Sequence, residues 1–221
     1  MSYENRFWQL PEGCKERSDI FDEHLKCTSK NKEYLKVING LEEKLANSER
    51  FMALYDDYEV KPYISPDRDL QTEDFKPVPR KNMEILGKGL LAGDIILLWR
   101  IRFGTFTNDT VYSKYFEYSY GIDGPTHMQS LLAKGYAFEE SAFDSLDHIA
   151  AGLKKKILKT KDVKGLSKMK AADLDQALKD HFSEEELGSF FVVRGYALTE
   201  KGSKAIDDNP QVIDRHPKKK F

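Results

Sequence analysis

Cysteine is scarce in this chain of 221 residues, which has only Cys14 and Cys27. Two thiols with no second pair cannot form a disulfide framework, and their spacing is not that of a zinc site. We expect both to be free thiols, as is usual in a reducing compartment.

Long apolar runs are also missing. The longest apolar stretch, residues 90–103, is interrupted by one aspartate and two arginines, so it is too short and too charged to span a bilayer. Residues 1–4 do not begin the charged and apolar regions of a signal peptide. The sequence therefore predicts a soluble, cytoplasmic protein with no membrane partner.

The chain has no excess of one charge, because 35 Lys and Arg face 37 Asp and Glu, a net of −2. Total charge therefore gives no indication of a nucleic-acid partner, and any electrostatic argument has to be local. Aromatic residues make up 12% of the chain, which is too many for a disordered protein. At this length folding buries roughly 70% of the extended surface, enough for a core without staples.

Catalytic motifs are absent as well. The five histidines show no H-E-x-x-H or Cys–His metal spacing. There is no G-x-S-x-G nucleophile elbow and no G-x-x-x-x-G-K-[ST] phosphate loop. Asp144, Asp147 and His148 are close in sequence, and we interpret them as solvent-exposed. We expect no enzyme, cofactor or metal; an enzyme would need groups that converge from distant positions.

Residues 1–58 are predicted to form an acidic, helical N-terminal segment. Apolar residues at alternating spacings of four and three place one stripe on a helix within residues 15–58. The members of this stripe are Tyr34, Ile38, Leu41, Leu45, Met52 and Tyr55. We interpret the stripe as a core face, and a homodimer or partner seam is the alternative. Residues 59–82 contain four prolines, which disfavour helix, and are predicted to be a linker.

Residues 83–140 are predicted to form a small helical unit. Residues 90–103 are apolar on nearly every face and predict a buried helix, and residues 109–116 predict a second, short one. A third helix is expected between Asp123, as N-cap, and Gly135, which suits the position after a helix end.

A short strand is expected at residues 136–138, directly after the third helix. Three helices and then a strand are typical of a helix-turn-helix or winged-helix unit, although any small helical bundle has the same order.

Residues 141–221 complete the predicted organisation, and residues 145–178 hold the strongest charge asymmetry of the chain. Two helices joined by a basic loop are expected there. Residues 154–170 contain eight lysines and one aspartate, a local net of +7. The candidate phosphate-binding residues are Lys154, Lys155, Lys156, Lys159, Lys168 and Lys170. Clustered lysines neutralise phosphates well, but a solvated lysine-rich face without a ligand is equally consistent with charge alone.

This segment resembles the SAP domain, a small module of helix, extended loop and helix. The matching positions are Leu153-Lys154, Ile157-Leu158-Lys159, the loop anchor Val163, the basic start Lys168 to Lys170, and the apolar Leu174 and Leu178. The resemblance implies binding to double-stranded DNA with little sequence preference, often as an accessory to another module.

The C-terminal part adds a capping box, Ser183 with Glu186, that predicts a further helix. The segment 196–202, an aromatic strand that leads into L-T-E-K-G, resembles the segment after the recognition helix in many bacterial winged-helix proteins, and it echoes residues 134–138. Together these features resemble uncharacterised proteins of Gram-positive bacteria and their phages. Residues 215–220 are predicted to be a basic tail.

The sequence thus predicts a mainly α-helical protein with minor short β-strands, in which a SAP-like helix pair accompanies a helix-turn-helix-like unit. The expected function is non-enzymatic association with double-stranded DNA through the six lysines. The alternative is an adaptor or regulatory protein of a phage or mobile element, whose lysine face contacts an acidic protein.

Overall fold

The computed structural model describes residues 31–40, 52–66, 68 and 76–217. The chain divides into one unit of residues 1–54 and 70–72 and a second unit of residues 55–69 and 73–221. In the first unit, residues 31–40 are helical. Leu41, Leu45 and both cysteines lie outside the described residues.

The apolar stripe predicted for the N-terminal helix does not form a core where it is described. Tyr34 and Ile38 are exposed, whereas Tyr55 is fully buried within the second unit. The interpretation of the stripe as a core face is therefore wrong for Tyr34 and Ile38. A seam with another chain stays a prediction.

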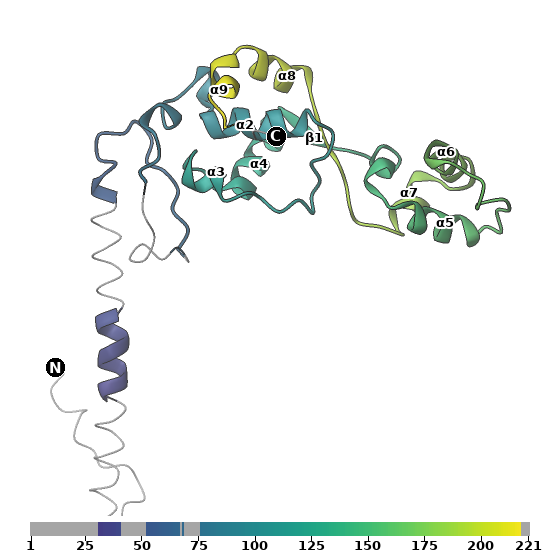
Figure 1. The fold of residues 1–221 in the computed structure, drawn as a ribbon, viewed down its shortest axis with the longest axis horizontal. Helices are drawn as coiled ribbons and strands as arrows, with labels where there is room; N and C mark the ends of the chain where they lie inside the picture. The colour runs from purple at the N-terminus through teal and green to yellow at the C-terminus, as the bar shows by residue number, and fades with distance from the viewer. Residues whose placement is uncertain (1–30, 41–51, 67, 69–75, 218–221) are drawn as a thin grey trace, which may run out of the picture. The chain divides into compact units, whose positions relative to one another are not determined.

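The described part of the second unit is mainly helical with one two-stranded antiparallel sheet, which confirms the prediction of a mainly α-helical protein with minor short strands (Figure 1). Its elements, in chain order, are the 3-10 helices η2 (Arg80–Asn82) and η3 (Gly87–Gly89), α2 (Ala92–Ile101), α3 (Tyr115–Tyr118), α4 (Gly124–Ala133), β1 (Ala137–Glu139), the 3-10 helix η4 (Asp144–His148), α5 (Ala151–Lys159), α6 (Ala171–His181), α7 (Glu184–Gly188), β2 (Tyr196–Leu198), α8 (Glu200–Asp207) and α9 (Pro210–Asp214). None of the described helices has the length and apolarity that a membrane crossing requires.

Helix α2 forms the centre of one core, as its continuous apolar sequence predicts. Its middle residues 95–98 are completely buried, and α4, α8, α9 and β2 pack around it. A Cβ atom on Gly93 would lie 2.6 Å from Ile122 Cδ1, so only glycine allows this close approach. The buried Asp94 accepts a hydrogen bond from the Leu91 amide (2.8 Å) and contacts His127 Nδ1 (2.7 Å).

Helix α4 begins and ends where the sequence predicts. The Asp123 carboxylate accepts a hydrogen bond from the Thr126 amide (3.1 Å), and Pro125 occupies the first turn. Gly135 follows the C-cap with a positive φ of 69°, a conformation that glycine adopts without steric cost.

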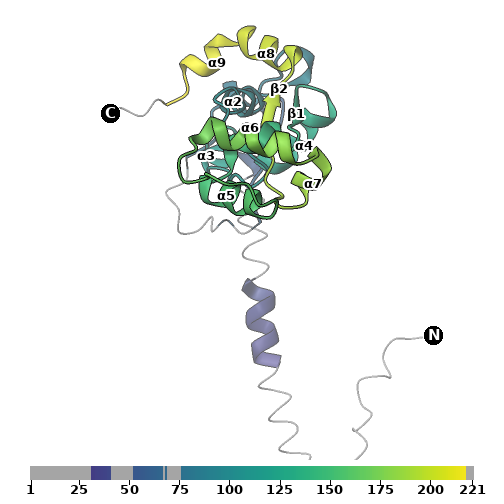
Figure 2. The same ribbon diagram turned by 90° about the vertical axis from the view of Figure 1, so that its right-hand side faces the viewer.

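The two predicted strands, which have similar sequences, pair with one another. Strand β1 pairs antiparallel with β2, with Ala137 opposite Leu198 and Phe138 opposite Ala197 (Figure 2). A side chain on Gly202 of α8 would collide with the Tyr136 carbonyl. Helices α8 and α9 thereby complete the core around α2 rather than extend the lysine-rich helix pair.

The short helix predicted at residues 109–116 is wrong, because α3 begins only at Tyr115. The preceding chain is occupied by long-range pairing. Thr107 forms a bridge with Gly195, and the Asn108 amide donates to the Arg194 carbonyl (2.9 Å). These contacts hold the chain extended where a local helix would otherwise start.

The described parts of the predicted linker are packed against the second unit. The Tyr63 amide donates to the Gly121 carbonyl (2.7 Å), and the Tyr58 hydroxyl donates to the Val78 carbonyl (2.8 Å). The predicted basic tail begins in a similar way, since Arg215 donates to the Lys81 carbonyl (3.1 Å). Lys218, Lys219 and Lys220 lie outside the described residues.

His216 joins α9 to an aromatic cluster beside α2 and α3. Its Nδ1 lies 2.7 Å from the Tyr120 hydroxyl, and its ring contacts Trp99 and Tyr115. Burial, and secondarily the nearby Arg100, lower the pKa of His216. Burial also raises the pKa of Tyr120 to about 12.

This environment predicts a loss of stability on acidification. Below a pH of about 6.5 the histidine of the unfolded chain gains a proton that the folded chain resists, so the free energy of unfolding falls as the pH drops. Thermal melts between pH 7.5 and 5 should therefore show a shallower decline for His216→Gln than for the unmodified chain. His181→Gln, on an exposed histidine of α6, is the control, and an unchanged decline in His216→Gln would contradict the expectation.

Candidate functional site

The lysine-rich segment folds as the predicted helix, loop and helix. Helices α5 and α6 pack against one another around their own apolar cluster. Buried members of this cluster include Ile157, Leu158, Leu166, Leu174, Leu178, Phe182 and Leu187. The predicted loop anchor Val163 is partly buried against this cluster. The helix pair is therefore a scaffold with its own apolar core.

The second helix is fixed at its start by Asp173. The Asp173 carboxylate accepts a hydrogen bond from the Lys170 amide (2.9 Å), and an acid in the first turn is favoured by the helix dipole. The backbone at the end of the basic loop, which bears Lys168 and Lys170, is thereby held at the N-terminus of α6.

Lys154, one of the six candidate phosphate-binding lysines, does not lie at the surface. Its side chain is 4% exposed, and its ammonium group pairs with Asp175 of α6. The reason is helical spacing: position 154 lies three and four residues before the buried Ile157 and Leu158, so it shares their face. Lys154 therefore neutralises an acid inside the helix pair and is not accessible to a ligand.

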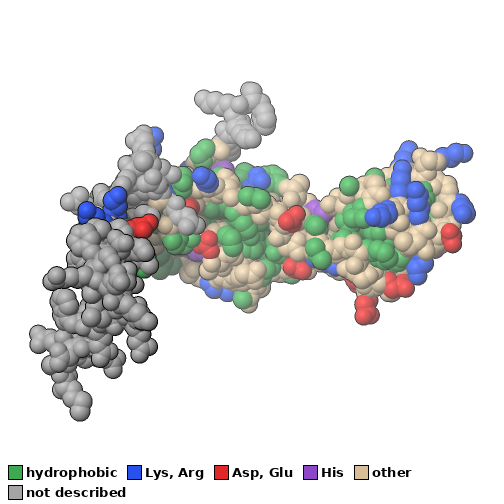
Figure 3. Space-filling model, turned by 90° about the horizontal axis from the view of Figure 1, so that it is seen from below, with side chains coloured by type: hydrophobic (Ala, Val, Ile, Leu, Met, Phe, Trp, Pro, Cys, Tyr) green, Lys and Arg blue, Asp and Glu red, His purple; other side chains and the backbone are tan. Residues whose placement is uncertain are grey.

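The other five candidate lysines remain at the surface. Lys156, Lys159, Lys168 and Lys170 are exposed, and Lys155 is partly exposed. Within the described residues none of the five forms an ion pair, whereas Lys161 of the same segment pairs with Glu186 (3.2 Å). We call Lys155, Lys156, Lys159, Lys168 and Lys170 the lysine surface. Figure 3 shows Lys and Arg side chains gathered over the segment that carries the helix pair, with acidic side chains at its edge.

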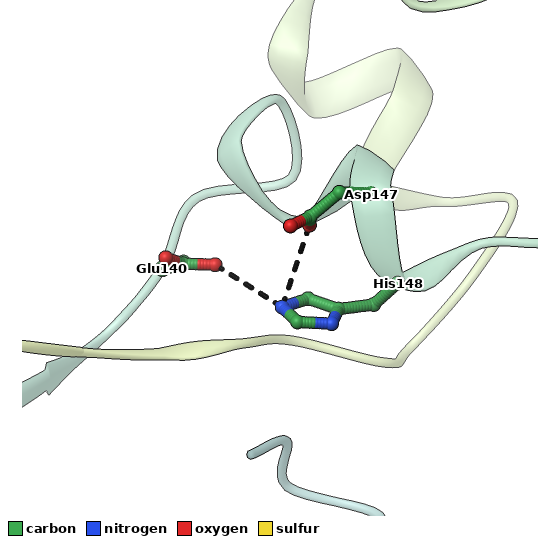
Figure 4. Close-up of side chains that lie close together, drawn as sticks. All are labelled: Glu140, Asp147 and His148. Carbon is green, nitrogen blue, oxygen red and sulfur yellow. Dashed lines mark ion pairs between the residues drawn. The ribbon is translucent and has the colours of Figure 1, made fainter. Parts of the chain in front are cut away.

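A second polar cluster lies where the segment of the helix pair joins the sheet. His148 Nε2 is 3.5 Å from Glu140 Oε2 and 3.4 Å from Asp147 Oδ1 (Figure 4). Asp144 and Asp147 are exposed, as predicted, but the His148 side chain is only 10% exposed. The prediction that this histidine is solvent-exposed is therefore wrong. Glu140 was not identified from the sequence, because no local spacing connects it to residues 147 and 148.

Comparison of the chain with protein-family models, with curated proteins and with solved structures finds no match.

The buried ion pair predicts an asymmetric response to mutation. Asp175→Asn leaves the buried Lys154 ammonium without its partner and should lower the free energy of unfolding by about 3 kcal/mol. The double variant Lys154→Met/Asp175→Leu removes both charges and should recover most of that loss. Urea denaturation measures both effects.

The matched control is Lys156→Met, which changes an exposed lysine of the same helix. Its free energy of unfolding should stay within about 0.5 kcal/mol of that of the unmodified chain. A cost for Asp175→Asn no larger than that of the control would show that the pair does not stabilise the helix pair.

Proposed function

We propose that the helix pair binds the phosphate backbone of double-stranded DNA through the lysine surface. This proposal rests on the difference in burial and pairing among the six candidate lysines. One lysine is neutralised inside the pair by Asp175, while five exposed or partly exposed lysines have no acidic partner among the described residues. Uncompensated charge of one sign on a fixed scaffold attracts a polyanion and raises its rate of association.

The nature of the charged groups indicates which part of DNA they contact. A lysine ammonium is a compact point charge on a flexible stem, so it neutralises phosphate without distinguishing base edges. The proposed binding is therefore tolerant of sequence. The SAP-like order of α5, loop and α6 supports the same proposal, because that module is associated with double-stranded DNA. The helix-turn-helix resemblance of residues 83–140 stays a prediction.

Self-association through the N-terminal helix also stays a prediction. Tyr34, Leu35, Val37 and Ile38 are large apolar side chains that are exposed on the helix of residues 31–40. Their exposure is compatible with a second copy of the chain or a protein partner.

The DNA proposal predicts a strong dependence on salt. Five phosphate contacts give a slope of about −4.5 for log K against log salt, so affinity should fall about 500-fold between 50 and 200 mM. Fluorescence anisotropy with a labelled duplex measures this slope. The variant Lys155→Gln/Lys159→Gln/Lys168→Gln retains two contacts and should fall only about 12-fold over the same range.

The matched control, Lys76→Gln/Lys88→Gln/Lys134→Gln, removes the same charge from exposed lysines outside the helix pair. It should keep the slope of the unmodified chain. An unchanged slope in the first variant would refute the assigned surface. Absence of DNA binding at 50 mM salt, together with lysine-dependent binding of poly-glutamate, would favour the acidic protein partner instead.

A further inference from the structure

Glu140, Asp147 and His148 converge at the junction between the sheet and the helix pair. Glu140 directly follows β1, and Asp147 and His148 end the 3-10 helix η4. The chain returns beside them at Gly195, one residue before β2. Residues from both ends of the segment 140–195 therefore meet at one point.

The three possible ligand atoms lie within 4.8 Å of one another, and the two distances from His148 match the spacing of ligands around a metal ion. His148 Nε2 lies 3.4 and 3.5 Å from the two carboxylate oxygens, beyond the usual 2.7–3.2 Å of an N–H···O hydrogen bond. Ligand atoms around a tetrahedral ion are about 3.4 Å apart when each lies about 2.1 Å from the metal. In Figure 4 the Nε2 atom faces both carboxylates.

One oxygen of the cluster has no hydrogen bond to the described residues, although it lies 3.5 Å from His148 Nε2. Glu140 Oε2 is buried and accepts no hydrogen bond in the described structure, and the His148 side chain is nine-tenths buried. Leaving a buried carboxylate oxygen unsatisfied costs free energy. One proton on Nε2 can bond to only one of the two carboxylates, whereas a divalent cation satisfies both.

We infer that Glu140, Asp147 and His148 bind one divalent transition-metal ion of the zinc class. Imidazole and carboxylate ligands together suit zinc and its neighbours better than magnesium or calcium, which favour oxygen alone. Three protein ligands leave the fourth tetrahedral position to water. The inference is independent of DNA binding, because it uses none of the five lysines.

The surroundings hold the ligands in position and give a cation access. Gly195 donates to Ser145 Oγ (3.0 Å) and accepts a hydrogen bond from the Glu140 amide (2.9 Å). Any side chain on Gly195 would collide with the Glu140 carboxylate and the His148 ring. Beside the cluster is an open hollow of about 470 Å³, whose charged lining residues are Glu140, Asp144, Asp147, Asp175 and Lys179. Asp175 is paired with Lys154, but the other three carboxylates outnumber the one remaining lysine, so the lining has a net negative charge.

Isothermal titration calorimetry with zinc chloride tests the inference. The titration is done in a Cys14→Ser/Cys27→Ser background, so that thiols do not contribute. We expect one ion per chain and a rise in melting temperature with zinc. His148→Ala should abolish this binding, and Asp147→Asn, at an exposed position that is tolerant of change, should weaken it at least by the roughly 10- to 100-fold that loss of an outer partner costs.

His181→Ala removes an exposed histidine of α6 and should bind zinc like its parent. Magnesium chloride should neither bind at the same concentrations nor raise the melting temperature. Absence of zinc binding, or equal affinity in the parent, His148→Ala and Asp147→Asn proteins, would overturn the inference.

Discussion

The antiparallel pairing of β1 with β2 is the contact on which the rest of the second unit depends. These six residues bring together chain segments about 60 positions apart. The pairing places α8 and α9 against α2, and the close approach of Gly202 to the Tyr136 carbonyl leaves no room for looser packing. The helix pair and its apolar cluster lie between β1 and β2 in the sequence. The core around α2 is therefore built from residues on both sides of this insertion.

The helix pair shows how one residue type takes two physical roles within a few positions. Lys154 and Lys155 are neighbours, yet one is buried against Asp175 and the other belongs to the lysine surface. Consecutive residues of a helix lie about 100° apart around its axis, so one can face the core while the next faces solvent. The interior pair uses charge to join two helices, and the outer lysines keep their charge for a ligand.

Short sequence patterns predicted the features that depend on residues within a few positions of one another. Residues 90–103 are apolar throughout, and the helix they form is buried. Asp123 and Gly135 mark helix limits through backbone chemistry that acts within a turn. The buried faces of α5 and α6 follow from their apolar spacing. The failures are non-local: Asn108 is held by Arg194, and His148 is covered by Glu140 and Gly195, and nothing near these positions in the sequence shows these partners. Lys154 is different, because its spacing to Ile157 and Leu158 did place it on the buried face, although its charge argued for the surface.

One hydrogen bond, from the Glu140 amide to the Gly195 carbonyl, brings together the two ends of the segment that carries the helix pair. Because those ends are adjacent and the segment has its own apolar cluster, it is a self-contained insertion between β1 and β2. A tight turn in its place would still join β1 to β2. The segment that carries the lysine surface can therefore change in sequence or length without disturbing the core around α2.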